Sequence, residues 1–126
     1  MFAFEPDEES FGLLQHNLTL NHCKNVMPFR AALGAMDAPE MKLYGYGDLF
    51  QLYHTLSPKK IAHPGIEPTG AYQMVEMMKL DTAIPPKVDM IKIDVEGCEE
   101  DVLQGARDII RGNPEIIVIF EGKLND

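Results

Sequence analysis

Two carboxylates, Asp94 and Glu96, stand at the end of a predicted strand over 88–96 and are the first candidates for chemistry. Side chains alternate between the two faces of a strand, so Lys92 joins both carboxylates on the face opposite the isoleucines. Charges on one face of a core strand are costly to bury unless they are paired or serve a site. Ligands bind beyond the carboxyl ends of strands in open α/β sheets. The pair therefore predicts a site in which a carboxylate orients a substrate hydroxyl or accepts its proton.

The same residues allow two other interpretations, which the sequence leaves open. Two carboxylates can hold a divalent cation through their oxygen atoms. Alternatively, Lys92 forms an ion pair with Asp94, and Glu96 lies in the first turn of the following helix. Ion pairs of this kind also occupy strands that have no function. From these residues alone, a site and a structural ion pair are equally favoured.

A third carboxylate, Glu5, follows the short apolar segment 1–4 and precedes Pro6. Pro6 favours an extended backbone at Glu5, and Asp7 is a good N-cap for a helix. An acidic residue between a strand and a helix can bind the two ribose hydroxyls of a nucleotide. It can also simply cap or solvate the turn, and its position alone favours this simpler role.

The elements that position these carboxylates follow from local patterns in the sequence. Apolar residues at helical spacing predict a helix from Asp7 to about Asn21. Pro28 favours an edge position for the strand that contains it. Three segments are predicted strands: 26–33, 41–44 and 72–80. Two segments are predicted connectors, 36–41 and 81–87, and prolines and glycines predict an irregular insert at about 45–70.

The helix that follows residues 88–96 is the best specified element. Its first turn is acidic and its last turn is basic, which suits the helix dipole, and the segment 112–114 (Gly-Asn-Pro) contains stop signals. The apolar segment 116–120 then predicts another strand. A strand, a helix and a strand with short links form a βαβ unit, whose strands are parallel. The predicted fold class is therefore α/β.

Composition excludes several classes of function. The chain has 126 residues, of which 45% are hydrophobic, and this fits one domain over 1–126. The net charge of -9 opposes binding to nucleic acid or to an anionic membrane surface. No segment is apolar for long enough to span a bilayer. Two distant cysteines, Cys23 and Cys98, fit reduced thiols and a cytoplasmic location, and they form no metal-ligand spacing.

One block of the sequence is specific enough to indicate a family. It is Ile91-Lys92-Ile93-Asp94-Val95-Glu96-Gly97, followed by Glu99 and Leu103-Gln104-Gly105-Ala106. Three shorter segments stand in the matching order: Phe2-Ala3-Phe4-Glu5-Pro6, Ala31-Ala32-Leu33-Gly34 and Leu80-Asp81. Together they resemble the FkbM family of S-adenosylmethionine-dependent methyltransferases, which belong to the Rossmann-like class I.

This resemblance implies a mostly parallel sheet with flanking helices. It implies that Glu5 binds the ribose of S-adenosylmethionine and that Ala32 lies in the turn near the adenine. Asp94 and Glu96 then line the methyl-transfer cleft as the catalytic residues. The implied reaction is O-methylation of a small-molecule, sugar or lipid hydroxyl.

Two parts of the family pattern are absent from the sequence. The family places a strand and a glycine-rich cofactor loop before the strand that ends at Glu5, and a hairpin after the position of Glu121. The resemblance therefore implies a domain truncated at both ends, with weak or no cofactor binding by this chain alone. The strands that end at Glu5 and Asp94 should then leave a gap in the sheet or pair directly.

Two functions without methyl transfer are compatible with such a truncation. One is a non-catalytic interaction or regulatory domain derived from a methyltransferase. The other is a metal-binding domain that uses the carboxylates of Asp94 and Glu96. An exposed sheet edge would also favour self-association.

Overall fold

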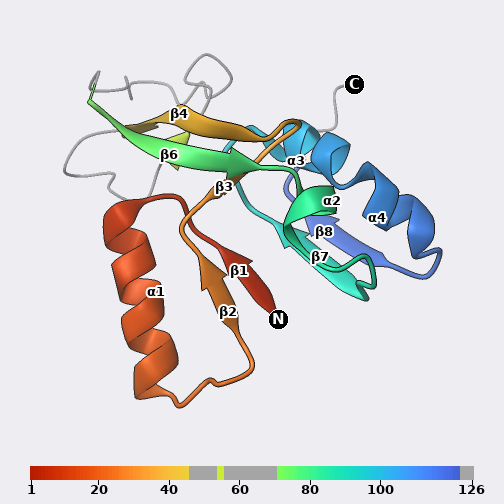
Figure 1. The fold of residues 1–126 in the computed structure, drawn as a ribbon, viewed down its shortest axis with the longest axis horizontal. Helices are drawn as coiled ribbons and strands as arrows, with labels where there is room; N and C mark the ends of the chain where they lie inside the picture. Colours follow the sequence, from red (N-terminus) through yellow and green to blue (C-terminus); the bar gives the residue numbers. More distant parts are fainter. Residues whose placement is uncertain (46–53, 56–70, 123–126) are drawn as a thin grey trace.

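The computed structural model describes residues 1–45, 54–55 and 71–122. Most of the insert expected at 45–70 lies outside these residues. The described chain contains both helices and strands, as the α/β class predicts (Figure 1). In chain order the elements are β1 (Phe2–Phe4), α1 (Glu8–Leu20), β2 (Met27–Phe29), β3 (Ala32–Leu33), β4 (Ala38–Gly45), β5 (His54–Thr55), β6 (Tyr72–Met78), α2 (Leu80–Ala83), β7 (Met90–Ile93), α3 (Glu99–Gly105), α4 (Arg107–Gly112) and β8 (Ile117–Phe120).

The strands of the described residues form three small sheets. β1 is parallel to β2, and β7 is parallel to β8. The third sheet has the order β3-β6-β4-β5, in which β3 and β6 are parallel and β4 is antiparallel to both of its neighbours. Helix α1 lies beside β1 and β2, whereas α3 and α4 lie beside β7 and β8 (Figure 1). The predicted Rossmann-like α/β arrangement is confirmed.

Strands β1 and β7 do not pair with each other. Within the described part of the chain, β1 pairs with β2 alone and β7 with β8 alone. Phe4 of β1 nevertheless packs against the apolar cluster that contains Ile91 and Ile93 of β7. Of the two expected outcomes, direct pairing is therefore not observed, and β1 and β7 stay in separate sheets, as the expected gap implies. The two parallel pairs meet through side chains.

Helix α1 begins and ends where the sequence predicts. Asp7 is its N-cap, and the backbone N–H of Ser10 donates to Asp7 Oδ2 at 2.7 Å. Glu8 and Glu9 occupy the first turn, where negative charge suits the helix dipole. Asn21 is the C-cap of the helix. The start of α1 is thus fixed directly after the turn that carries Glu5.

The segment predicted as one strand over 26–33 forms two strands in different sheets, β2 and β3. The break falls after Phe29, because the chain leaves β1 there and joins β6 at Ala32. Pro28 lies inside β2, opposite Ala3. The N–H of Met27 donates to Met1 O at 2.9 Å. The nitrogen of the next residue, Pro28, therefore points away from β1, to the outer edge of the sheet. A proline is tolerated there because it has no N–H to donate.

Two predicted connectors are partly regular structure. Residues 36–41 were expected to form a loop, but β4 begins at Ala38, because it pairs with β6 along most of its length. A register shift between Ala38 and Met41 accommodates Pro39. Within 81–87, the first residues belong to the short helix α2, which brings the buried Leu80 into the core.

The strand predicted over 88–96 ends at Ile93, and the helix after it is divided at Ala106. The division has a clear cause in long-range hydrogen bonds. The backbone N–H groups of Asp108 and Ile109 donate to the two carboxylate oxygens of Asp81, at 3.0 and 2.9 Å. Asp81 therefore caps a new helix at this point, although no local pattern in the helix predicts it.

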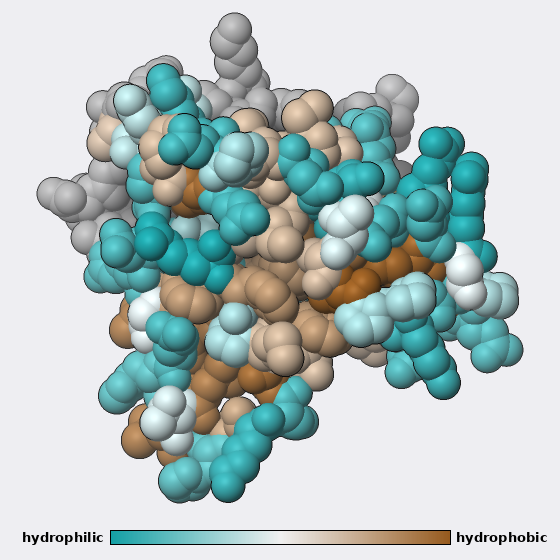
Figure 2. Space-filling view, in the orientation of Figure 1, coloured by the Kyte–Doolittle hydropathy of each residue, from teal (hydrophilic) through white to brown (hydrophobic). Residues whose placement is uncertain are grey.

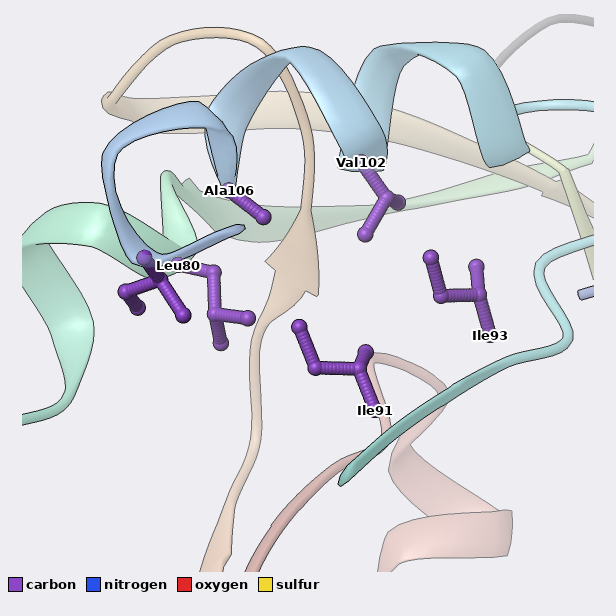
Figure 3. Packing of buried hydrophobic residues seen from close by; sticks show 6 residues of the cluster. Leu80, Ile91, Ile93, Val102 and Ala106 are labelled. Atoms are coloured by element: carbon purple, nitrogen blue, oxygen red, sulfur yellow. The ribbon is translucent and has the colours of Figure 1, made fainter. Parts of the chain in front are cut away.

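The main core holds β7 against the helices. Its buried residues come from α2, β7, α3, α4 and the residue between the last two helices: Leu80, Ile91, Ile93, Val102, Ala106 and Ile109. Figure 3 shows Val102 directed toward Ile91 and Ile93 of the strand. A second cluster joins β3, β4 and β6 through Ala32, Leu43, Val75 and Met77. The end of β7 is thus anchored by a packed core.

The other face of the β7–β8 pair is open. Met90 and Ile117 face each other in register and are 56% and 53% exposed, and Ile119 is 50% exposed. Apolar surface also lies at the centre of the face seen in Figure 2, between polar margins.

None of the helices in 1–45, 54–55 and 71–122 is long and apolar enough to cross a membrane.

Candidate active site

Asp94 and Glu96 lie in the turn after β7, one and three residues beyond its end. The prediction that both lie on one face of a strand is therefore wrong, because the period of two stops at Ile93. Asp94 is exposed and Glu96 is half-buried. Glu96 has a φ of 50° and Gly97 a φ of 94°. A left-handed backbone is uncommon for a residue with a side chain, and such residues cluster at functional sites.

The alternative in which Lys92 pairs with Asp94 is not observed. Within the described residues, the salt bridge that forms joins Arg30 Nη1 to Glu8 Oε1 at 3.8 Å, on the surface of α1. Both Lys92 and Asp94 are exposed at the end of β7. The charges of this strand end are therefore not explained by a local ion pair.

Glu99, at the start of α3, supports the turn that carries both carboxylates. Its Oε1 atom accepts hydrogen bonds from the backbone N–H groups of Val95 at 3.4 Å and Gly97 at 3.2 Å. The sequence places Glu99 in the family block but gives it no role of its own. Its relation to the turn could have been noticed from the short spacing alone.

Glu5 follows β1 and is half-buried. Its backbone N–H donates to Phe29 O at 3.0 Å, and its Oε1 accepts from the backbone N–H of Asp7 at 2.9 Å. The backbone on both sides of this side chain is thus fixed. A carboxylate has about four acceptor sites on two oxygens, so it can accept several hydrogen bonds at once.

Gln73, on β6, holds the same region and was missed in the sequence. Its Nε2 donates to Asp7 Oδ1 at 2.6 Å, and its Oε1 accepts from the backbone N–H of Glu8 at 3.0 Å. Asp7 is 6% exposed. A contact across 66 residues leaves no local signal, so sequence reasoning could not have found it.

Ala32 lies in β3, opposite Met77, and is 4% exposed within the second cluster. The structure therefore places Asp94 and Glu96 in one turn and Glu5 after a separate parallel strand. Ala32 lies in another sheet. Strands β1 and β7 run in the same direction in Figure 1, so Glu5 and Asp94 both follow carboxyl ends. Ligands of α/β sheets bind beyond the carboxyl ends of the strands.

A surface hollow of about 410 Å³ is lined by residues of α1, of the loop that follows it and of β2, including Leu18, His22 and Pro28. No group of three or more His, Cys, Asp or Glu side chains in the described ranges is placed to hold a metal ion. The metal-binding alternative therefore finds no support among these residues.

Comparison with known proteins gives first the class and then the family. The fold resembles the crystal structure of a methyltransferase FkbM from Methylobacillus flagellatus KT, with a TM-score of 0.58 and 18% sequence identity. The similarity covers 93% of this chain and 24% of that one, so this chain spans about a quarter of its neighbour. No curated protein matches the chain. The methyltransferase FkbM domain model matches residues 1–125, and the chain therefore belongs to this family of methyltransferase domains.

Proposed function

We propose that this domain takes part in S-adenosylmethionine-dependent methylation of a hydroxyl group on a small molecule, a sugar or a lipid. The observation that carries the proposal is the family match over residues 1–125, with acidic residues after the parallel strands β1 and β7. S-adenosylmethionine, when bound, supplies a methyl group that is already activated. The residues of this chain then have to bind the cofactor, orient the acceptor hydroxyl and accept its proton.

Glu5 binds the ribose of the cofactor in this proposal. Its half-buried carboxylate is held by Asp7 and is placed at the carboxyl end of β1. Carboxylate oxygens accept hydrogen bonds from the two ribose hydroxyls in α/β nucleotide sites. Ala32 is the adenine-side residue in the same scheme, and it lies buried in β3.

Asp94 orients the acceptor hydroxyl or accepts its proton, and Glu96 lies in the same turn. Asp94 is exposed and has no ion-pair partner within the described residues. An oriented carboxylate within reach of the hydroxyl lowers the barrier to methyl transfer. Neither Cys23 nor Cys98 forms a disulfide. Reduced thiols fit a reducing compartment, so a cytoplasmic location forms part of the proposal.

The test is transfer of a radiolabelled methyl group from S-adenosylmethionine to sugars, lipids and small alcohols. Asp94→Asn keeps the size of the side chain but removes the proton acceptor, and it should lower kcat by about 10²-fold or more. Asp89→Asn, an exposed substitution before β7, is the matched control. Transfer that is equally fast in the Asp94→Asn variant would exclude this role.

The second candidate is an interaction domain that associates through its open strand edges. The backbone groups of Met1 and Glu5 form hydrogen bonds with β2, through Met1 O and Glu5 N. Because backbone groups alternate along a strand, those of Phe2 and Phe4 point to the opposite edge of β1. Such an edge can accept another strand. Analytical ultracentrifugation at rising concentration tests this candidate, and a constant monomer mass would exclude self-association.

A further inference from the structure

The turn after β7 has an unusual backbone that needs support. Glu96 adopts a left-handed conformation, with a φ of 50°, and Gly97 follows it with a φ of 94°. Only glycine adopts such angles readily, because a Cβ atom crowds the neighbouring carbonyl. The conformation at Glu96 therefore depends on contacts from outside the residue.

Glu99 supplies these contacts. Its Oε1 accepts from the N–H of Val95, before Glu96, and from the N–H of Gly97, after it. The two bonds converge on one oxygen atom and bracket the left-handed residue. Glu99 itself begins α3, and this helix is anchored in the core by Val102, which is 2% exposed.

We propose that Glu99 is a positioning residue for the methyl-transfer site. Its carboxylate fixes the turn in the conformation that sets the directions of the Asp94 and Glu96 side chains. The proposal rests on the role proposed above for Asp94. Glu99 touches the backbone of the turn and needs no contact with the acceptor or the cofactor.

Three substitutions separate geometry from charge. Glu99→Ala removes the acceptor of both hydrogen bonds. Glu99→Gln keeps an oxygen atom at the same place but removes the negative charge, so it should restore the turn. Glu100→Ala is the matched control, because Glu100 is the exposed neighbour in the same helical turn.

The first measurement follows the turn itself by NMR. In Glu99→Ala, exchange of the Gly97 amide hydrogen should become about tenfold faster, the factor for a lost hydrogen bond of ordinary strength. The HN–Hα coupling of Glu96, which reports φ, should change with it. Glu99→Gln and Glu100→Ala should keep values close to those of the native chain. An unchanged Gly97 amide and Glu96 coupling in Glu99→Ala would overturn the proposal.

The second measurement is methyl transfer by the same variants. Glu99→Ala should lower kcat and leave the KM for S-adenosylmethionine unchanged, since the cofactor-side carboxylate of Glu5 follows β1, in another sheet. A turn that changes in Glu99→Ala while kcat stays native would also overturn the proposal. If the native chain and Asp94→Asn are alike in transfer, the proposed function fails, and the positioning role at an active site falls with it. The NMR result still shows separately whether Glu99 holds the turn.

Discussion

Gly105 in α3 packs directly against the backbone of Gly34. A Cβ atom at Gly105 would overlap the carbonyl oxygen of Gly34 and would lie 3.0 Å from its carbonyl carbon and 3.4 Å from Lys79 Cα. All three neighbours are backbone atoms, which cannot turn aside as a side chain can. The close approach holds α3 against the end of β3, so only glycine fits at this position.

Gly105→Ala should therefore destabilise the domain by about 1–3 kcal/mol, the cost of overpacking a close contact. Urea denaturation followed by circular dichroism measures the free energy of unfolding. Gly12→Ala is the matched control: Gly12 lies in α1 with nothing within 4 Å of an added Cβ, so alanine should raise stability slightly. Equal stability of the two variants would contradict the packing described here.

Gln73→Glu should weaken the link between β6 and the start of α1. The substitution keeps the shape of the side chain but replaces the N–H donor with an oxygen that faces Asp7 Oδ1, where Gln73 now donates at 2.6 Å. The cost should be about 1–3 kcal/mol at neutral pH. Two adjacent carboxylates raise the pKa of the pair, so the loss should shrink as the pH falls and one of them is protonated.

Chemical denaturation of Gln73→Glu at several pH values checks this prediction. Glu76→Gln is the control: it changes the charge of the same strand by one at an exposed position. A stability difference from the native chain that is the same at acidic and neutral pH would contradict the contact with Asp7.

Asp37 should make the stability of the fold depend on pH in the acidic range. The backbone N–H of Lys79 donates to Asp37 Oδ1 at 2.8 Å and Thr82 Oγ1 donates at 2.9 Å, and these bonds hold the pKa of Asp37 below its ordinary value of 3.8. A lowered pKa in the folded state stabilises the fold above the unfolded pKa, and this is lost as the pH falls through the folded pKa. In Asp37→Asn this part of the acid dependence should disappear, whereas Glu40→Gln should keep it. Acid titrations of thermal stability that coincide for native and Asp37→Asn chains would exclude the effect.

Asp81→Ala should destabilise α4. The carboxylate of Asp81 accepts from the backbone N–H groups of Asp108 and Ile109 and caps this helix. Loss of an N-cap typically costs about 0.5–2 kcal/mol. Amide hydrogen exchange should accelerate first at Asp108 and Ile109. Asp89→Ala is the exposed control, and the prediction fails if the two variants unfold at the same urea concentration.

Local patterns predicted the elements whose causes are local. The N-cap Asp7, the stop signals at 112–114 and the parallel pair β7–β8 are all confirmed. The errors arise where distant residues decide. The division of 26–33 depends on which sheet each half joins, and the break at Ala106 follows a cap supplied by Asp81 from α2.

The site follows the same division. The block that contains Asp94 and Glu96 predicted a strand followed by a helix, and β7 and α3 lie there. The left-handed φ of Glu96 was hidden, because side-chain alternation assumes that the strand continues. Gln73 supports the Glu5 region through its hydrogen bond to Asp7. The two residues are far apart in the chain, so their spacing could not predict this contact. The roles of Glu5, Ala32, Asp94 and Glu96 stay predictions.

An NMR titration with S-adenosylhomocysteine tests the central proposal most directly, because it detects even weak binding and reports where the ligand lies. The amides of Glu5 and Asp7 should shift with the ligand, and the shifts should be lost in Glu5→Gln and with an analogue that lacks both ribose hydroxyls. Amide shifts that are the same in the native chain and in Glu5→Gln would contradict the proposal. Shifts centred on the hollow beside His22 would contradict it as well.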